Sequence, residues 1–221
     1  MCKLKSGLLF KNGVFVPDYD SHDKMLREKC IEDTAENRIA GKFVRFELSP
    51  ENDDPFVPID MWVFKIDQDE LPEWIKSDPK KYEAMARAAV KEWAEKHIFI
   101  GIDKLNLTDG SGYYLKDCTN VTLSGSSTVQ DMWGSSTVQD MRDSSTVRNM
   151  RGSSTVQDMR VSSTVQYMSG SSTVQIAENL SKGVNVKTII LSQNAIIKDC
   201  RTKTLYAVGD WKLSIKEESD A

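Results

Sequence analysis

The sequence predicts a mainly β protein: a short-repeat parallel β-helix or β-roll solenoid, preceded by a small α+β capping domain. The first observation is a nine-residue sequence repeat that occurs six times between residues 126 and 179, with the consensus Ser-Ser-Thr-Val-Gln-Asp-Met-Arg-Gly. The second is the globular, non-repetitive composition of the residues that precede it. Self-similarity at a short fixed period is typical of a solenoid, in which each copy buries its apolar side chains against its neighbours.

The residue types in each copy of the repeat favour one β-strand followed by one turn. Two packed helices cannot fit in nine residues, whereas a Thr-Val pair favours extended structure and Gly with Ser supplies a turn. Alternation along the strand turns Val129 and Ser127 inward and leaves Thr128 outward. Met132 breaks this alternation, so we expect a bend at Asp131 that returns Met132 to the core.

One strand and one corner per nine residues give two strands and about 18 residues per coil. Residues eighteen apart should therefore stack on neighbouring coils. This predicts that Arg142 meets Arg160 and that Asp140 meets Asp158, each stack flanked by opposite charge. It also predicts a Thr ladder on each wall: Thr128, Thr146 and Thr164 on one, Thr137, Thr155 and Thr173 on the other.

We expect three parts: a capping domain over 1–108, the solenoid over 109–203, and a closing hairpin with a charged tail over 204–221. A cap is expected because the bare end of a solenoid exposes unpaired strand edges. In the closing hairpin, residues 204–208 should pair with 211–215.

The expected elements of the capping domain begin with a hairpin over 8–16, turning at Asn12-Gly13. Ser21 is expected to cap a short helix, and strands are predicted over 43–48, half-buried, and 61–66.

The clearest helix of the capping domain should begin after Asp78 as cap and end near His97. Six residues share one face of it at helical spacing and are predicted core: Tyr82, Met85, Ala86, Ala89, Val90 and Trp93.

The four cysteines have neither metal-site nor redox spacing. Cys118 and Cys200 follow similar tetrapeptides, which indicates two related strand ends rather than a disulfide. The sequence has neither an export signal nor a stretch long enough to span a membrane, so reduced thiols in a cytoplasm are expected. The net charge of -4 and the pI of about 5.4 argue against nucleic acid as a partner.

Metal and catalytic sites find little support in the sequence. The repeat lacks the double glycine of calcium β-rolls, so calcium binding is not expected. Loop acids of the capping domain match no calcium-loop spacing and are expected to be solvated: Asp53, Asp54, Asp67, Asp69, Glu70 and Glu73. His22 lies beside Asp20 and Asp23, but without a nucleophile in a suitable context a catalytic triad is unsupported. We therefore predict no catalytic residue, no metal and no cofactor.

Four repeat residues are candidate partner contacts: Trp133, Arg142, Arg151 and Arg160. Trp133 replaces Arg at its repeat position and points outward by strand parity. It either anchors a partner or packs beneath the capping domain. The Arg residues either bind an anionic polymer or belong to a solvated face compensated by neighbouring Asp residues.

The chain resembles uncharacterised bacterial and prophage-borne proteins that join a small N-terminal α+β domain to short Thr-Val repeats forming a parallel β-helix. The resemblance rests on residues 21–26, on residues 43–50 and on the repeats. It implies a fold but no active site. The expected function is a non-enzymatic structural or interaction module, with the solenoid as a rigid scaffold for a protein partner or a second copy. The alternative, motivated by the fold alone, is a carbohydrate-binding or carbohydrate-cleaving β-helix protein.

Overall fold

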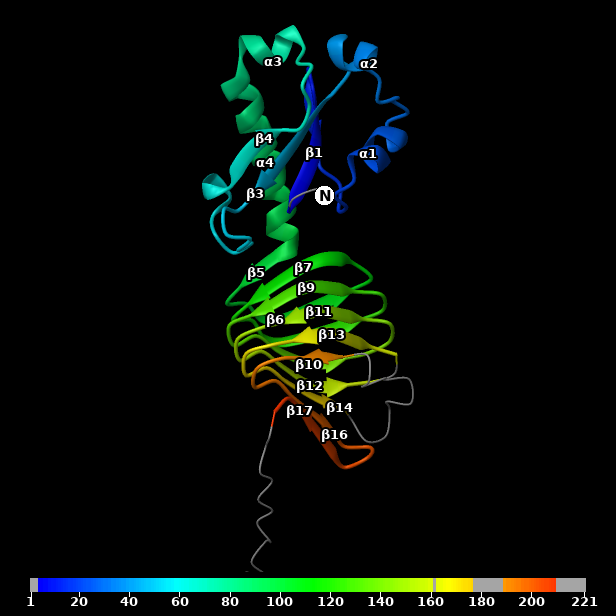
Figure 1. The fold of residues 1–221 in the computed structure, drawn as a ribbon, viewed down its shortest axis with the longest axis vertical. Coiled ribbons are helices and arrows are strands. Elements are labelled where there is room, and N and C mark those ends of the chain that lie inside the picture. Colours follow the sequence, from blue (N-terminus) through cyan, green and yellow to red (C-terminus); the bar gives the residue numbers. More distant parts are fainter. Residues whose placement is uncertain (1–3, 161, 177–188, 210–221) are drawn as a thin grey trace, which may run out of the picture. The chain divides into compact units, whose positions relative to one another are not determined.

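The computed structural model describes residues 4–160, 162–176 and 189–209 and confirms the predicted fold class (Figure 1). The chain divides into two compact units, with the boundary between Phe99 and Ile100. The first unit is α+β, and the second is a parallel β-solenoid.

The first unit contains a four-stranded antiparallel sheet with the order β2-β1-β3-β4. Its strands are β1 (Lys5–Phe10), β2 (Gly13–Phe15), β3 (Val44–Ser49) and β4 (Val63–Ile66), the last preceded by the 3-10 turn η1 (Ile59–Met61). The predicted hairpin is confirmed, but Phe10 pairs with Gly13, so its two loop residues are Lys11 and Asn12 rather than Asn12 and Gly13.

The strand predicted over 43–48 is buried more completely than expected. β3 lies between β1 and β4, and five of its six residues are buried, Glu47 among them. The alternating sequence indicated one solvated face. That prediction is wrong: on the second face Glu47 and Ser49 are buried as well, and Arg45 is partly buried.

Four helices complete the described part of this unit: α1 (His22–Glu28), α2 (Ala35–Ile39), α3 (Glu73–Ser77) and α4 (Pro79–His97). Ser21 caps α1, as predicted, by accepting a hydrogen bond from the backbone N–H of Lys24 at 3.3 Å. Asp78 caps α4 in the same way through Lys81 at 3.1 Å. These side chains satisfy N–H groups that have no partner within the helix.

The predicted core stripe of α4 is confirmed, with Tyr82, Ala86, Val90 and Trp93 buried. Met85 and Ala89 are partly buried. The stripe continues to His97, which is also buried and ends the helix as expected.

The second unit is built from two parallel sheets whose strands alternate along the chain, so that each coil contributes one strand to each sheet. The six-stranded sheet has the order β15-β13-β11-β9-β7-β5, and the seven-stranded sheet β17-β16-β14-β12-β10-β8-β6. The outer faces of these sheets are called here the six-strand wall and the seven-strand wall. The strands are β5 (Ile98–Ile100), β6 (Asp103–Thr108), β7 (Ser111–Lys116), β8 (Thr119–Ser124), β9 (Thr128–Trp133), β10 (Thr137–Met141), β11 (Thr146–Met150), β12 (Thr155–Met159), β13 (Thr164–Met168), β14 (Thr173–Ile176), β15 (Ile190–Leu191), β16 (Ile196–Asp199) and β17 (Thr204–Ala207).

The stacking interval of eighteen residues is confirmed. On the seven-strand wall Thr137 pairs with Thr155, and on the six-strand wall Thr146 pairs with Thr164. Both predicted Thr ladders are present. Thr155 and Thr173, eighteen apart, also exchange a side-chain hydrogen bond at 3.2 Å.

The core of the solenoid consists of Val, Met and Ser ladders. In the described residues the repeat Val, Met and second Ser positions are all buried. Val129 and Met132 both point inward although they are three residues apart, and β9 runs on through Asp131. Two outward residues lie between them, and β9 pairs with β11 in unbroken register from Val129 through Asp131 to Met132, so the strand continues where a bend was expected.

The corners form ladders of residues with positive φ. Gly134, Gly152 and Gly170 stack there with φ of 65°, 66° and 68°. At the preceding corner Asp117 has φ of 54°, and its carboxylate accepts the backbone N–H of Ser135 on the next coil at 2.9 Å. At these corners neighbouring coils are therefore joined by stacked glycines and by the hydrogen bond to the Asp117 carboxylate.

The parallel stacking of the seven-stranded sheet ends where β17 pairs antiparallel with β16. Tyr206 is half-buried in β17. The segment 211–215, which was expected to pair with 204–208, lies outside the described residues. Cys118 lies two residues after the end of β7, and Cys200 directly follows β16. Both are free thiols, which confirms the prediction of two strand ends rather than a disulfide.

Candidate functional site

The four candidate contact residues lie on two different walls. On the six-strand wall Trp133 is the last residue of β9 and Arg151 follows β11. On the seven-strand wall Arg142 follows β10 and Arg160 follows β12. Consecutive copies alternate between the sheets, so the structure brings these residues together as two pairs and not as one cluster.

Trp133 and Arg151 form a stacked pair on the six-strand wall. The Arg151 guanidinium carbon lies 5.4 Å from the centroid of the Trp133 ring, within the range of a cation–π interaction. Trp133 also aligns with Lys116 on the preceding coil. Trp133 is partly buried by these neighbours. Its packing beneath the capping domain stays a prediction.

Asp131 lies under this pair. Its Oδ1 is 3.3 Å from Nε of Arg151. Burial raises the pKa of the Asp131 carboxyl, and the nearby Arg151 charge opposes that rise without cancelling it. Asp131 thus draws the Arg151 side chain against the wall and over the indole ring.

On the seven-strand wall the charges alternate in a continuous network. Asp140 contacts Arg142 on its own coil at 3.5 Å and Arg160 on the next coil at 3.4 Å. Arg160 also pairs with Asp158, two residues before it. This is the predicted compensated ladder, in which each guanidinium is matched by a carboxylate.

A groove with a volume of about 580 Å³ lies near the C-terminal end of the seven-strand wall. Its lining combines Thr, Gln and Lys side chains with apolar ones, among them the exposed Leu205: Thr155, Gln157, Thr173, Gln175, Lys198, Ile196 and Leu205. Sequence reasoning missed this groove because it depends on β17 folding back beside β16.

His22 is buried in the first unit, and both of its ring nitrogens face oxygen atoms. Nε2 is 3.2 Å from the Phe46 carbonyl oxygen, and Nδ1 is 3.3 Å from an Asp67 carboxylate oxygen. Of the two acids beside it in sequence, Asp20 instead accepts a hydrogen bond from Lys5 at 2.8 Å. The histidine therefore joins α1 to the sheet region and is held as a structural link.

Lys5 was not singled out from the sequence, although it is fully buried. Its Nζ donates to Asp20 and, at 2.6 Å, to the Pro17 carbonyl, and it lies 4.7 Å from the centroid of the Trp93 ring. Burial lowers the pKa of this amine, and Asp20 opposes the shift. The sequence around this lysine does not indicate that its side chain is buried.

The acidic loop residues do not converge. Asp67 contacts His22, Glu70 pairs with Arg38 at 3.0 Å, and Asp54 accepts the backbone N–H of Phe56 at 2.9 Å. Within the described residues, no group of three or more His, Cys, Asp or Glu side chains is placed to hold a metal ion.

A shallow pocket of about 260 Å³ in the first unit is lined by Asp18, Glu92, Trp93, Lys96 and His97, among others. The His97 ring stacks on Trp93 with centroids 4.7 Å apart, and its Nε2 is 3.3 Å from Asp18. Its Nδ1 lies 2.8 Å from the Trp93 carbonyl oxygen, so both nitrogens are engaged in ending α4.

No helix among the described residues combines the length and apolarity required to cross a membrane. Comparisons with protein-family models, with curated proteins and with solved structures found no match to this chain.

Proposed function

We propose that the protein is a non-enzymatic structural or interaction module, in which the solenoid is a rigid scaffold that presents side chains to a protein partner. The observation that supports this is the strict eighteen-residue register of the repeats. Identical core ladders hold every outward position at a fixed height and on a fixed wall, so the walls can vary in sequence without loss of the fold.

The proposal places the protein in a cytoplasm and relates it to the bacterial and prophage-borne repeat proteins that it resembles. The thiols of Cys30, Cys118 and Cys200 agree with a reducing compartment. The order of a small α+β unit followed by a Thr-rich β-solenoid agrees with the resemblance.

Carbohydrate binding is the second candidate, because the groove on the seven-strand wall offers hydroxyl and amide groups beside the apolar Leu205. Binding to a glycan array that is lost in Thr173→Val and Gln175→Leu variants, but kept in a Trp133→Arg variant, would favour this groove. If the wild-type protein binds no glycan on the array, carbohydrate binding is excluded as the second candidate function.

The scaffold proposal is tested by lengthening the solenoid. One variant receives a second copy of residues 135–152 after Gly152, which adds a whole coil. A matched control receives only a second copy of residues 135–143 after Asp143. This adds half a coil and moves residue 144 and every later repeat to the opposite wall. Circular dichroism and thermal unfolding check that both variants are folded.

Partners captured by cross-linking to the wild-type chain are expected to bind the whole-coil variant and to be lost from the half-coil variant. Equal capture by all three proteins would contradict a role for the walls. An enzymatic activity of the full chain that is abolished by His22→Gln or His97→Gln, with the fold retained, would contradict the non-enzymatic proposal.

A further inference from the structure

The two walls of the solenoid differ in a systematic way. The copies on the seven-strand wall at 135–142 and 153–160 are identical to each other, and the described part of the third copy, 171–176, departs from them only at the buried Ile176. The three copies on the six-strand wall keep the same core residues but depart from the consensus on the outside. These outward departures are Trp133, Arg148, Asn149, Tyr167 and Ser169.

The departures change the charge of the six-strand wall. Two of its three Asp positions are occupied by Asn149 and Tyr167, and a Gln position is occupied by Arg148. Trp133 and Ser169 occupy two of its three Arg positions. Arg151 and the neighbouring Lys116 add two further cations, and Asp131 remains as the consensus carboxylate. The seven-strand wall, by contrast, matches Arg142 and Arg160 with Asp140 and Asp158.

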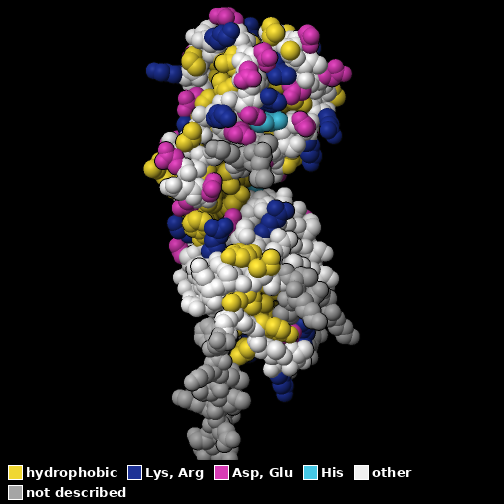
Figure 2. Space-filling model, viewed as in Figure 1, with side chains coloured by type: hydrophobic (Ala, Val, Ile, Leu, Met, Phe, Trp, Pro, Cys, Tyr) yellow, Lys and Arg dark blue, Asp and Glu magenta, His cyan; other side chains and the backbone are white. Residues whose placement is uncertain are grey.

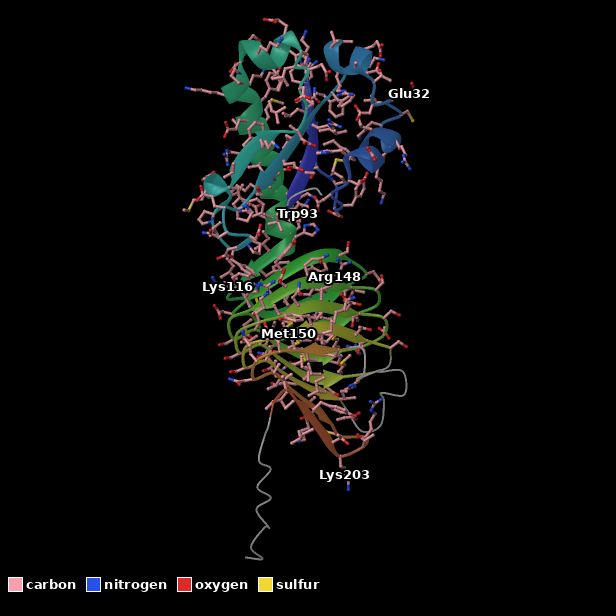
Figure 3. All side chains as sticks on the ribbon, in the orientation of Figure 1. Glu32, Trp93, Lys116, Arg148, Met150 and Lys203 are labelled. Atoms are coloured by element: carbon pink, nitrogen blue, oxygen red, sulfur yellow. The ribbon has the colours of Figure 1, made fainter. Side chains whose placement is uncertain are left out.

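Two cations of the six-strand wall, Arg148 and Arg151, are accessible. Arg148 is exposed, and no carboxylate forms an ion pair with it in the described part of the chain. The Arg151 side chain keeps 49% of its surface exposed while it contacts Asp131. Figure 3 labels Lys116 and Arg148 on the solenoid, and Figure 2 shows Lys and Arg side chains on the part of the solenoid that faces the viewer.

We infer that the six-strand wall is the interaction surface of the solenoid and that its partner is an acidic protein segment, rich in Asp and Glu. This rests on the proposed function and names its surface and partner chemistry. Exposed guanidinium groups bind carboxylates through paired, charge-assisted hydrogen bonds. The excess of positive charge on this wall is complementary to such a segment.

The geometry favours an acidic protein over a nucleic acid or an acidic polysaccharide. Stacking of bases or sugars needs a free aromatic face. Arg151 covers one face of Trp133, and both Trp133 and Tyr167, the two outward aromatic residues among the departures, are partly buried. The chain as a whole carries a net charge of -4, which opposes the approach of a long polyanion more than that of a short acidic segment.

The test uses the full chain and a fluorescent ten-residue oligo-glutamate peptide, with binding measured by anisotropy at low and moderate salt. Arg148→Gln installs the residue that all five other copies carry at this repeat position. Arg142→Gln on the seven-strand wall is the matched control, since it removes the same charge from the compensated wall. Arg148→Gln is expected to raise the Kd about fivefold and Arg142→Gln less than about twofold, both effects shrinking with salt.

Absence of oligo-glutamate binding, or equal weakening by both variants, would overturn the inference. Tighter binding of a thymidine oligonucleotide or of heparin than of oligo-glutamate would overturn the choice of an acidic protein. A gain of about tenfold in affinity when Glu217 and Glu218 are both changed to Gln would overturn an external partner in favour of the chain's own tail. If any of these results appears while the whole-coil variant still captures its partners, the inference fails and the proposed function stands.

Discussion

Gly152 stacks so closely on Gly134 that a Cβ atom added to Gly152 would come within 2.9 Å of the Gly134 carbonyl oxygen. Gly170 repeats this relationship on Gly152, with 2.6 Å to the carbonyl oxygen. All three have positive φ, so two independent constraints, backbone conformation and space, favour glycine at these corners. The corner ladder therefore couples neighbouring coils through the backbone itself.

The Gly152→Ala variant is expected to lose about 2–3 kcal/mol of unfolding free energy, because strain at positive φ adds to the clash with Gly134. Gly101→Ala is the matched control, since Gly101 also has positive φ but a Cβ there meets no atom within 4 Å. We expect that variant to lose only about 1 kcal/mol in urea denaturation. Equal losses of unfolding free energy in the two variants would show that the close stacking of Gly152 on Gly134 does not restrict the residue type at this corner.

Met150 lies between Met132 and Met168 in a ladder whose members are all fully buried. Met150→Ala should leave a cavity that the two neighbours cannot fill, and we expect a loss of about 3 kcal/mol by chemical denaturation. The control is Gln166→Ala, which shortens an exposed side chain on the six-strand wall and should change stability by less than about 0.5 kcal/mol. An unfolding free energy of the Met150→Ala variant equal to that of wild type would contradict a packed core.

Asp131→Asn is expected to stabilise the solenoid at neutral pH. The folded pKa of Asp131 is raised by burial, so between the unfolded and folded pKa the unfolded chain has released a proton that the folded chain retains. Stability from this group therefore falls as pH rises through that window. The Tm of the variant should exceed that of wild type at pH 7 and match it at pH 3, and a lower Tm at pH 7 would show that the Arg151 pair outweighs burial.

Asp199→Asn should behave in the opposite way. Asp199 is buried and accepts hydrogen bonds from the Arg201 side chain at 2.8 and 2.7 Å, which holds the pKa of its carboxyl below the usual value. Its contribution is present above the unfolded pKa and is lost as pH falls through the folded pKa. Thermal scans should show the variant less stable than wild type at pH 7, with the difference shrinking below pH 4; a constant difference would exclude an electrostatic origin.

The repeats made the solenoid predictable because six near-identical copies report the same inward and outward positions. Val129 inward, Thr128 outward and the eighteen-residue stacking interval all followed from period and side-chain type. The division of the candidate residues into two pairs needed one more step, since odd and even copies alternate between sheets.

Other features could not be read locally. The burial of Lys5 depends on Pro17 and Asp20, twelve and fifteen residues away, and the central position of β3 depends on pairing with β1 before it and β4 after it in the chain. The groove beside Leu205 depends on the antiparallel return of β17. Each of these arises from contacts that no short window of sequence contains.

The most direct measurement of the two-walled register is disulfide formation between engineered cysteines. Thr146→Cys with Thr164→Cys joins register partners on adjacent coils, whose Cα atoms in a parallel sheet lie about 4.8 Å apart, within disulfide range. Thr146→Cys with Thr155→Cys is the control, nine residues apart and on opposite walls. The structure predicts that mild oxidation and peptide mapping will find the first disulfide and not the second; the second forming in preference to the first would contradict the solenoid described above.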